Sequence, residues 1–316
     1  MKKYSLGRTG IKVTELCFGA LPIGPLQVNI SVEEGARLIR IALEKGINFI
    51  DTAEGYKTYP HIKRALEDYS GEVIIATKSP ATTYSEMEKS IQDALLSLQR
   101  PLIDIFHLHA ARSTASVFEE RAGAWQCLKD YKAKGVIRAI GISTHDVGAV
   151  KRAIEIEEVD VIFPIINLLG MGITGGNLQD MIRLIGEAEK AGKGVYAMKA
   201  LAGGHLIDRL EEALNFVRNI RGISSVAVGM LNLQELELNI AIFNDEKLSP
   251  GLNFEQLKPK KSLFIAGFCK GCGTCVDACP NHALSLKNGK AVVDHNLCIL
   301  CGYCNPVCPE FAIRLI

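Results

Sequence analysis

Short, mostly apolar runs alternate with longer amphipathic segments over most of the chain. The runs have the length of strands, and nearly every position in them is apolar, as expected for strands buried on both faces. Eight of them occur, at residues 15–21, 47–51, 73–78, 102–109, 137–143, 159–166, 194–199 and 223–229. Strands that alternate with helices form parallel sheets joined by right-handed crossovers. The pattern therefore predicts an α/β fold.

Two of the intervening segments begin with the signature of a helix start, a capping box. One opens with Ser31 and Glu34 and closes on Gly46, and the other opens with Ser85 and Glu88. The apolar positions of the second segment fall on one helical face; they are Met87, Ile91, Ala94, Leu95 and Leu98. We therefore predict amphipathic helices that pack against the sheet.

Eight strand–helix units are the number that closes a (β/α)8 barrel. The alternative is an open doubly wound sheet, which carries a G-x-G-x-x-G turn after its first strand. The chain has GALPIGPLQ at that point, so we predict a TIM barrel over residues 1–250. The alternation stops after Asp245. Residues 251–261 are expected to link the barrel to a small C-terminal domain at 262–316.

The composition limits the functions open to this chain. It has 316 residues, 48% of them hydrophobic, and a formal net charge of +1. Such a chain can bury a large core but does not attract nucleic acid or an anionic membrane. No run approaches the roughly 18 apolar residues of a membrane span, and the start, MKKYSLGRTG, lacks the apolar segment of a secretory signal. We expect a cytoplasmic protein with no nucleic-acid or membrane partner.

Cysteines are concentrated near the C-terminal end. Of ten, only Cys17 and Cys127 lie in the predicted barrel, where we expect them to pack as small apolar residues. The other eight form two copies of the pattern C-x2-C-x2-C-x3-C-P, and Cys298 of the second copy lies 29 residues after Cys269 of the first. The repeat indicates an internal duplication. Such a dense cluster in a long chain without a signal points to metal rather than to disulfides.

The repeated pattern is the ligand run of a [4Fe–4S] cluster, in which three cysteines bind one cluster and the fourth binds the other. One cluster would be held by Cys269, Cys272, Cys275 and Cys308, and the other by Cys298, Cys301, Cys304 and Cys279. Zinc is the alternative, but zinc sites usually pair two C-x2-C halves across a longer gap. The tail resembles the two-cluster bacterial ferredoxins, which implies an α+β ferredoxin-like domain that moves single electrons.

Polar residues stand at the ends of three adjacent predicted strands, where TIM-barrel enzymes carry their active sites. Asp51 ends the second strand and Tyr56 follows it, while Lys78 ends the third strand. His109 ends the fourth. A phenol is a weak acid at neutral pH, but a neighbouring ammonium lowers its pKa, and a carboxylate holds the ammonium in place. The four residues therefore predict a proton-donating site.

The segments GINFIDTAEGY, ATK, IDIFHLH and GIS resemble the aldo/keto reductase family, and the resemblance covers most of the predicted barrel. It implies that Tyr56 is the general acid and that Lys78 and Asp51 support it. His109 would orient the substrate carbonyl. His107 lies two residues earlier on the same face of the strand, but His109 stands at the family's position.

The same resemblance implies a nicotinamide cofactor that binds without a Rossmann fold. Ser143 and Asn167 would hold its carboxamide, and Asn239 would meet the adenine. Met198 stands where the family usually has an aromatic residue that stacks on the nicotinamide, and the family's frequent glutamine before Asn167 is missing. Members that prefer NADPH place a cation four residues before Asn239, where this chain has Glu235. Because a carboxylate repels the 2′-phosphate, we expect NADH to bind at least as well as NADPH.

The leading hypothesis is an iron–sulfur oxidoreductase of the aldo/keto reductase type. It would reduce a small-molecule carbonyl to an alcohol, or run the reverse oxidation, and pass single electrons through two [4Fe–4S] clusters. A redox protein would be a further partner. The alternative is an electron-transfer protein whose barrel is a docking platform or binds a flavin at its phosphate-site loops. The presence of both Tyr56 and Lys78 favours the enzyme.

Overall fold

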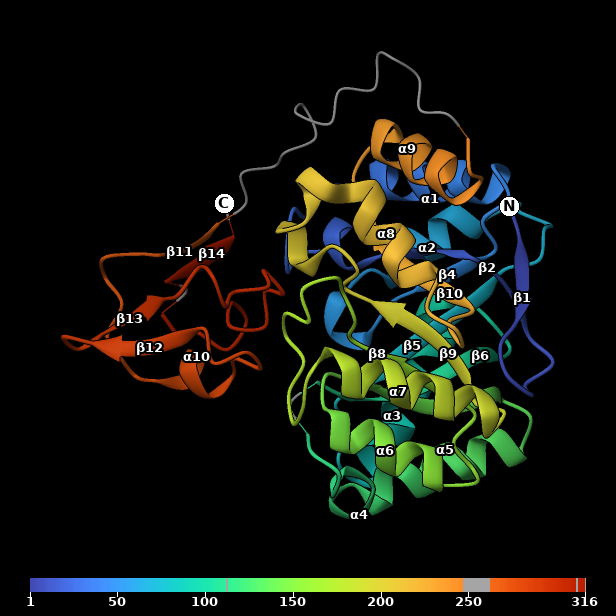
Figure 1. Cartoon of the computed structure of the whole chain (residues 1–316), viewed down its shortest axis with the longest axis horizontal. Helices are drawn as coiled ribbons and strands as arrows, with labels where there is room; N and C mark the ends of the chain where they lie inside the picture. Colours follow the sequence, from blue (N-terminus) through green and yellow to red (C-terminus); the bar gives the residue numbers. More distant parts are fainter. Residues whose placement is uncertain (112, 247–261, 311, 316) are drawn as a thin grey trace.

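The computed structural model describes residues 1–111, 113–246, 262–310 and 312–315. It contains a large domain and, beside it, a small C-terminal one (Figure 1). Eight parallel strands close the large domain into a barrel, with the last strand pairing back to the first. The predicted (β/α)8 barrel is confirmed. Its strands are β3 (Leu16–Gly19), β4 (Phe49–Asp51), β5 (Ile74–Ser79), β6 (Ile103–Ala110), β7 (Ile137–Thr144), β8 (Val161–Pro164), β9 (Gly194–Met198) and β10 (Ser225–Gly229).

Helices connect the strands and cover the outside of the barrel. They are α1 (Val32–Glu44), α2 (Tyr59–Leu66), α3 (Tyr84–Leu98), α4 (Val117–Glu120), α5 (Ala122–Ala133), α6 (Val147–Glu155), α7 (Leu178–Lys190), α8 (Leu210–Arg218) and α9 (Leu233–Phe243). Short 3-10 turns follow several strands: η1 (Leu21–Ile23), η2 (Glu54–Tyr56), η3 (Ala202–Gly204) and η4 (Ile207–Arg209).

The two predicted capping boxes have different outcomes. Ser31 and Glu34 form the capping box of α1, as predicted. The capping box of α3 is formed by Thr83 and Glu86, and not by Ser85 and Glu88. The sequence TTYSEME offers two overlapping Ser/Thr-x-x-Glu patterns. The earlier one begins the helix, because Glu86 also accepts hydrogen bonds from the backbone and side chain of Thr82.

Side chains fill the interior of the barrel. Phe49, Phe163 and Tyr196 are buried there, and the rings of Phe163 and Tyr196 stack with centroids 3.9 Å apart. Cys17 belongs to this interior cluster, and Cys127 belongs to the layer between the strands and the helices. Both cysteines therefore pack as small apolar residues, as expected.

A hairpin that the sequence pattern does not predict closes the end of the barrel where the strands begin. Its strands, β1 (Lys3–Ser5) and β2 (Lys12–Thr14), pair antiparallel. Leu6 lies in its turn and joins the interior cluster. Gly7 has a φ of 56° and runs so close to β9 that a Cβ there would lie 2.2 Å from the Gly194 nitrogen. Strands of three residues are too short for periodicity to reveal them.

The small domain is built from two antiparallel pairs of strands and a short helix. Strand β11 (Leu263–Ile265) pairs antiparallel with β14 (Ile313–Leu315), and β12 (Leu284–Lys287) pairs with β13 (Lys290–Val293). Helix α10 (Thr274–Asp277) lies between them in the sequence. The predicted linker, residues 251–261, lies outside the described residues.

The backbone of the small domain repeats with the sequence. Gly271 and Leu300, which are equivalent in the two copies, have φ values of 65° and 49°. The next equivalent pair, Gly273 and Gly302, has φ values of 84° and 79°. Positive φ is unusual for leucine, yet the cysteine loops of both copies hold the same left-handed conformation where the second copy has leucine in place of glycine.

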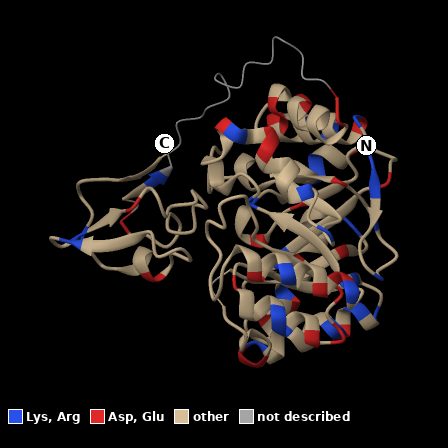
Figure 2. Ribbon diagram, in the orientation of Figure 1, with Lys and Arg blue, Asp and Glu red and all other residues tan. Residues whose placement is uncertain are grey.

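Charged residues of both signs are mixed over the helices of the barrel (Figure 2). Within the part of the chain that the structure describes, no helix combines the length and the apolar character that a bilayer crossing requires.

Candidate active site and iron–sulfur sites

Asp51 and Lys78 form a buried ion pair at the C-terminal end of the strands. The Lys78 ammonium donates to both carboxylate oxygens of Asp51, at 2.9 and 2.7 Å, and to the carbonyl oxygen of Thr52, at 2.7 Å. Burial raises the pKa of the Asp51 carboxyl and lowers that of the Lys78 ammonium, and their mutual attraction opposes both changes. Each ammonium proton has an acceptor, which stabilises the ionised pair.

Tyr56 and His109 lie next to this pair. Tyr56 ends η2, and its ring meets the His109 ring edge-on, with centroids 6.0 Å apart and an interplanar angle of 84°. The Lys78 ammonium lies 4.9 Å from the centroid of the Tyr56 ring. The structure thus brings together the four residues predicted for the proton-donating site. They come from β4, η2, β5 and β6.

The pKa of Tyr56 differs from the expectation. Burial raises it well above its usual value, and Tyr303 and Asp51 raise it further. The expected lowering by Lys78 is not found, because Asp51 and Thr52 take all three protons of the ammonium and none is directed at the phenol. Burial, together with the nearby charge of Lys78, also holds the pKa of His109 well below its usual value, so this imidazole is neutral at neutral pH.

His107 lies farther inside the barrel than His109. Its Nε2 atom is 2.9 Å from the hydroxyl of Tyr196, which in turn donates to Oδ1 of Asp51 at 3.0 Å. Sequence reasoning missed Tyr196. The available signal was its position on β9, two residues before Met198 and therefore on the same face of the strand. Tyr196 fixes the carboxylate that holds Lys78.

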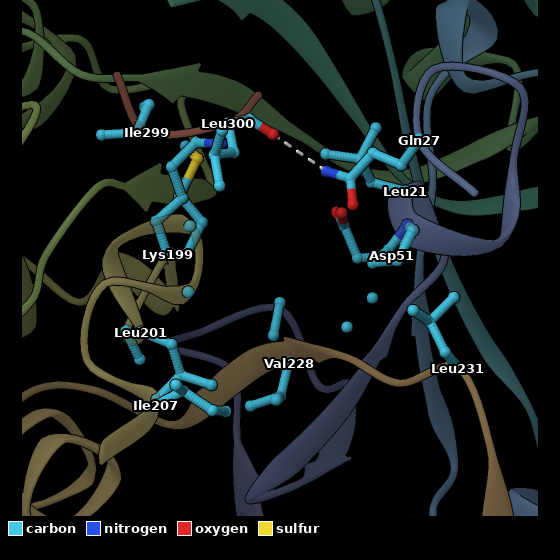
Figure 3. A pocket seen from close by; sticks show the side chains of 18 of the residues that line it. Leu21, Gln27, Asp51, Lys199, Leu201, Ile207, Val228, Leu231, Ile299 and Leu300 are labelled. Atoms are coloured by element: carbon cyan, nitrogen blue, oxygen red, sulfur yellow. Dashed lines mark hydrogen bonds between the residues drawn. The ribbon is translucent and has the colours of Figure 1, made fainter. Parts of the chain in front are cut away.

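A cavity of about 290 Å³ opens beside Tyr56. Its lining includes Asp51, Tyr56, Met198 and Glu235, with apolar residues from the loops that follow β3, β9 and β10. Figure 3 shows Gln27 and Leu300 joined by a hydrogen bond at one side of the cavity. Leu300 belongs to the small domain. The cavity is therefore lined by both domains.

The predicted cofactor residues do not all face this cavity. Met198 lines it. Asn167 instead holds its own loop: its amide donates to the Met171 carbonyl at 2.8 Å, and its Oδ1 accepts from the Leu169 and Met171 backbones. Ser143 Oγ and Asn239 Oδ1 are buried, and neither has a hydrogen-bond partner among the described residues. Neither Ser143 nor Asn239 lines the cavity, and Asn167 does not line it either.

The second cysteine loop of the small domain packs on the mouth of the barrel. Gln27 Nε2 donates to the Leu300 carbonyl at 3.2 Å, and His205 Nε2 lies 2.7 Å from the Cys298 carbonyl oxygen. Gly203 is so close to this loop that a Cβ there would lie 2.0 Å from the carbonyl oxygen of Ile299. Loops after β3 and β9 thus hold the residues around Cys298 and Leu300.

Tyr303, in the same cysteine loop, extends from the small domain into the candidate active site. Its hydroxyl lies 2.8 Å from His109 Nε2, and the two rings meet edge-on with centroids 5.7 Å apart. Tyr303 also lies close enough to Tyr56 to raise the pKa of that phenol. Sequence reasoning missed this residue as well. The signal was a departure from the repeat, since the equivalent residue in the first copy is Thr274.

The eight cysteines of the small domain surround two separate cavities. The members of each group come from both copies of the repeat, with three from one copy and the last cysteine of the other. One cavity is lined by Cys269, Cys272, Cys275 and Cys308, and the other by Cys279, Cys298, Cys301 and Cys304. The grouping is the one that the sequence pattern predicts.

Backbone N–H groups are directed at several of the sulfur atoms. Ala283 donates to Cys279 Sγ, and its equivalent in the second copy, Ala312, donates to Cys308 Sγ, both at 3.3 Å. Across the described ranges, no three His, Cys, Asp or Glu side chains converge closely enough to hold a single metal ion. Four thiols around a cavity, with N–H donors to sulfur, suit a four-iron cluster better than one zinc ion.

Comparison with known proteins agrees with this geometry. Residues 15–221, more than half of the chain, match the model of the aldo/keto reductase family. The chain belongs to the aldo/keto reductase family. Its C-terminal part, residues 268–314, matches a 4Fe-4S dicluster domain. An oxidoreductase barrel and an iron–sulfur domain are therefore joined in one aldo/keto reductase chain.

Individual relatives of this aldo/keto reductase are distant. L-galactose dehydrogenase of Arabidopsis thaliana is 25% identical over 305 residues, which cover 82% of this chain and 93% of that protein. Methylglyoxal reductase DkgA of Escherichia coli is 29% identical over 128 residues, 40% of this chain and 46% of that protein. The structure of PA4992 from Pseudomonas aeruginosa aligns with a TM-score of 0.68 at 24% identity, over 77% of this chain and 95% of that chain.

Proposed function

We propose that this chain is an iron–sulfur aldo/keto reductase that transfers a hydride between a nicotinamide cofactor and a small carbonyl or alcohol substrate. The observation that carries the proposal is the convergence of Tyr56, His109 and the Asp51–Lys78 pair beside a cavity that Tyr56 itself lines. A buried phenol next to a neutral imidazole can donate a proton and orient the group that receives it.

Each residue of the site has a part in this reaction. When bound, the nicotinamide supplies the hydride or accepts it. Tyr56 gives its proton to the carbonyl oxygen, and neutral His109 holds that oxygen in place. Lys78 stands at 4.9 Å from the ring centroid of Tyr56. To stabilise the phenolate that remains, its ammonium would have to turn one proton from Asp51 or Thr52 toward that oxygen. Asp51 keeps the ammonium in position, and Tyr196 keeps Asp51 in position.

The fit of a nicotinamide to the cavity has partial support. Met198 lines the cavity, whereas Ser143 and Asn239, whose side-chain oxygen atoms have no partner among the described residues, do not line it. Asn167 does not fit in this arrangement, since its amide bonds to its own loop.

The iron–sulfur domain would add single-electron transfer. We propose that the two groups of four cysteines hold two [4Fe–4S] clusters, which exchange one electron each. Cys272 is exposed on the first group, whereas Cys298, Cys301 and Cys304 of the second are buried. An outside redox protein would therefore meet the first cluster, and the barrel would meet the second.

A flavin in the cavity is the second candidate. A hydride carries two electrons and each cluster accepts one, so direct exchange between them is unfavourable, and a flavin handles both kinds of transfer. One observation favours a flavin. Ile299 and Leu300, which lie between the cluster ligands Cys298 and Cys301, line the same cavity as Tyr56. A ligand in that cavity would touch the second cluster loop.

Adding NADH to flavin-free protein is expected to leave both clusters oxidised over many turnovers, because a nicotinamide does not readily give up single electrons. Dithionite should reduce them. The measurement is anaerobic bleaching of the cluster absorbance, on protein whose flavin content is known from a cofactor-release assay. Rapid bleaching by NADH without flavin would contradict this proposal. Flavin found in the purified protein would instead support the second candidate.

NADH is expected to bind at least as tightly as NADPH. Glu235 lines the cavity and lies in the first turn of α9, four residues before Asn239, so its carboxylate would repel a 2′-phosphate there. The measurement is the dissociation constant of each nucleotide, side by side, for wild-type protein and for Glu235→Gln. The substitution should improve NADPH binding more than NADH binding. Much tighter binding of NADPH by the wild type would overturn this expectation.

A further inference from the structure

Tyr303 belongs to the iron–sulfur domain in sequence and to the barrel's candidate active site in space. It stands between Cys301 and Cys304, two ligands of the proposed second cluster. Its hydroxyl is 2.8 Å from His109 Nε2, and Tyr303 lies close enough to Tyr56 to raise the pKa of that phenol. Tyr303 therefore contacts the group that would orient a substrate and lies beside the group that would give it a proton.

A substrate oxygen needs this position. A carbonyl that is protonated by Tyr56 and oriented by His109 must bring its oxygen within hydrogen-bond reach of both side chains. That point is now taken by the Tyr303 hydroxyl, and two oxygen atoms cannot share it. Tyr303 therefore stands where the reacting oxygen would stand.

We infer that Tyr303 blocks the active site of its own chain. Its hydroxyl occupies the position of the substrate oxygen, so that a substrate binds only by displacing it. The iron–sulfur domain thereby supplies a residue that sets the barrel's affinity for its substrate. The inference rests on the proposed roles of Tyr56 and His109. The contact between Tyr303 and His109 stands on the geometry alone.

The domain does not need this contact in order to dock. Gln27, His205 and Gly203 hold the second cysteine loop at Leu300, Cys298 and Ile299. The loop is therefore held on the barrel by residues other than Tyr303.

Cluster binding does not need a tyrosine at this position either. In the first copy the equivalent residue is Thr274, whose hydroxyl oxygen lies 3.4 Å from Cys272 Sγ within its own loop. The tyrosine of the second copy is thus explained by its contact with the barrel and not by a need of the cluster.

Tyr303→Phe removes the hydroxyl and keeps the ring. The probe is 4-fluorobenzamide, a neutral carbonyl compound that is not a hydride acceptor, and its dissociation constant is measured by fluorine NMR. We expect Tyr303→Phe to bind the probe about tenfold more tightly than the wild type. This is about 1.4 kcal/mol, the size of one net hydrogen bond that the probe no longer has to displace. Affinities within twofold of each other would overturn the inference.

Three controls make the result specific. Tyr84→Phe removes a hydroxyl that bonds to Asp130, away from the site, and should leave the affinity unchanged. Adding Tyr56→Phe to Tyr303→Phe should reduce the gain, because the probe then loses the donor at Tyr56 and keeps only His109. Unchanged iron and acid-labile sulfide would show that the second cluster survives the substitution.

Turnover separates this inference from the proposed function. With a reducible carbonyl, Tyr303→Phe should lower KM and leave kcat nearly unchanged, as expected when a competing group is removed. A fall in kcat at constant KM and constant probe affinity would contradict the inference and make Tyr303 part of proton transfer. If no carbonyl is reduced by any variant, the proposed function fails, and the probe affinities still decide the place of Tyr303.

Discussion

Tyr56→Phe is expected to abolish carbonyl reduction and to leave nucleotide binding largely intact. The substitution removes the proton that the carbonyl oxygen receives but keeps the ring that lines the cavity. Loss of a general acid typically costs roughly 10²- to 10⁴-fold in rate. The measurement is kcat with a reducible carbonyl, together with the nucleotide dissociation constant.

A matched control exists for this substitution. Tyr59 is also buried, and its hydroxyl is 2.7 Å from Thr77 Oγ1, so Tyr59→Phe removes a buried phenol hydroxyl outside the proposed set. It should keep most of the activity. Wild-type turnover in Tyr56→Phe would exclude Tyr56 as the acid.

Lys78 requires a different design. Lys78→Met leaves the buried Asp51 carboxylate without its partner, which destabilises the fold by itself. The double variant with Asp51→Asn removes that charge and should recover stability but not activity.

Cys279→Ser is expected to damage the cluster that is bound mainly by the other copy of the repeat. Cys279 lies in the first copy, yet its side chain lines the cavity of Cys298, Cys301 and Cys304. Wild-type protein prepared anaerobically should carry about eight irons per chain, since two four-iron clusters imply that number. The variant should lose up to half of them. Iron and acid-labile sulfide analysis measures the loss.

Which of the two clusters is lost is a sharper test than the total loss of iron. Cys308→Ser should mirror Cys279→Ser and affect the first cluster, whose cavity it lines with Cys269, Cys272 and Cys275. If Cys279→Ser instead resembled Cys272→Ser in its EPR spectrum, the crossed assignment would be wrong. Zinc without acid-labile sulfide would overturn the iron–sulfur interpretation altogether.

Much of the fold could be predicted because its signals are local. Apolar runs mark the strands, and their number and alternation with helices indicate a closed barrel. The cysteine groups follow from a fixed spacing that a cluster imposes on its ligands. The N-terminal hairpin was missed because its strands, Lys3–Ser5 and Lys12–Thr14, are too short to show a period. The start of α3 was predicted two residues too late, because the sequence there contains two overlapping capping-box patterns.

Only the site residues that stand at strand ends could be predicted from the sequence. Asp51, Lys78 and His109 follow from the register of neighbouring strands. The raised pKa of Tyr56 depends on burial and on Tyr303, a residue more than two hundred positions away that arrives with the other domain. No pattern within the barrel segment carries that information, because contacts between domains leave no periodicity in either one.

Gly273 and Gly302 show how the duplication has diverged. Both have positive φ, so each cysteine loop needs a glycine for its own turn. At Gly273 an added Cβ would find only Leu286, at 3.8 Å, whereas at Gly302 it would lie 2.6 Å from the Leu26 carbonyl oxygen of the barrel. A side chain larger than glycine would therefore meet only its own domain at position 273, whereas at position 302 it would press the second cysteine loop away from the barrel.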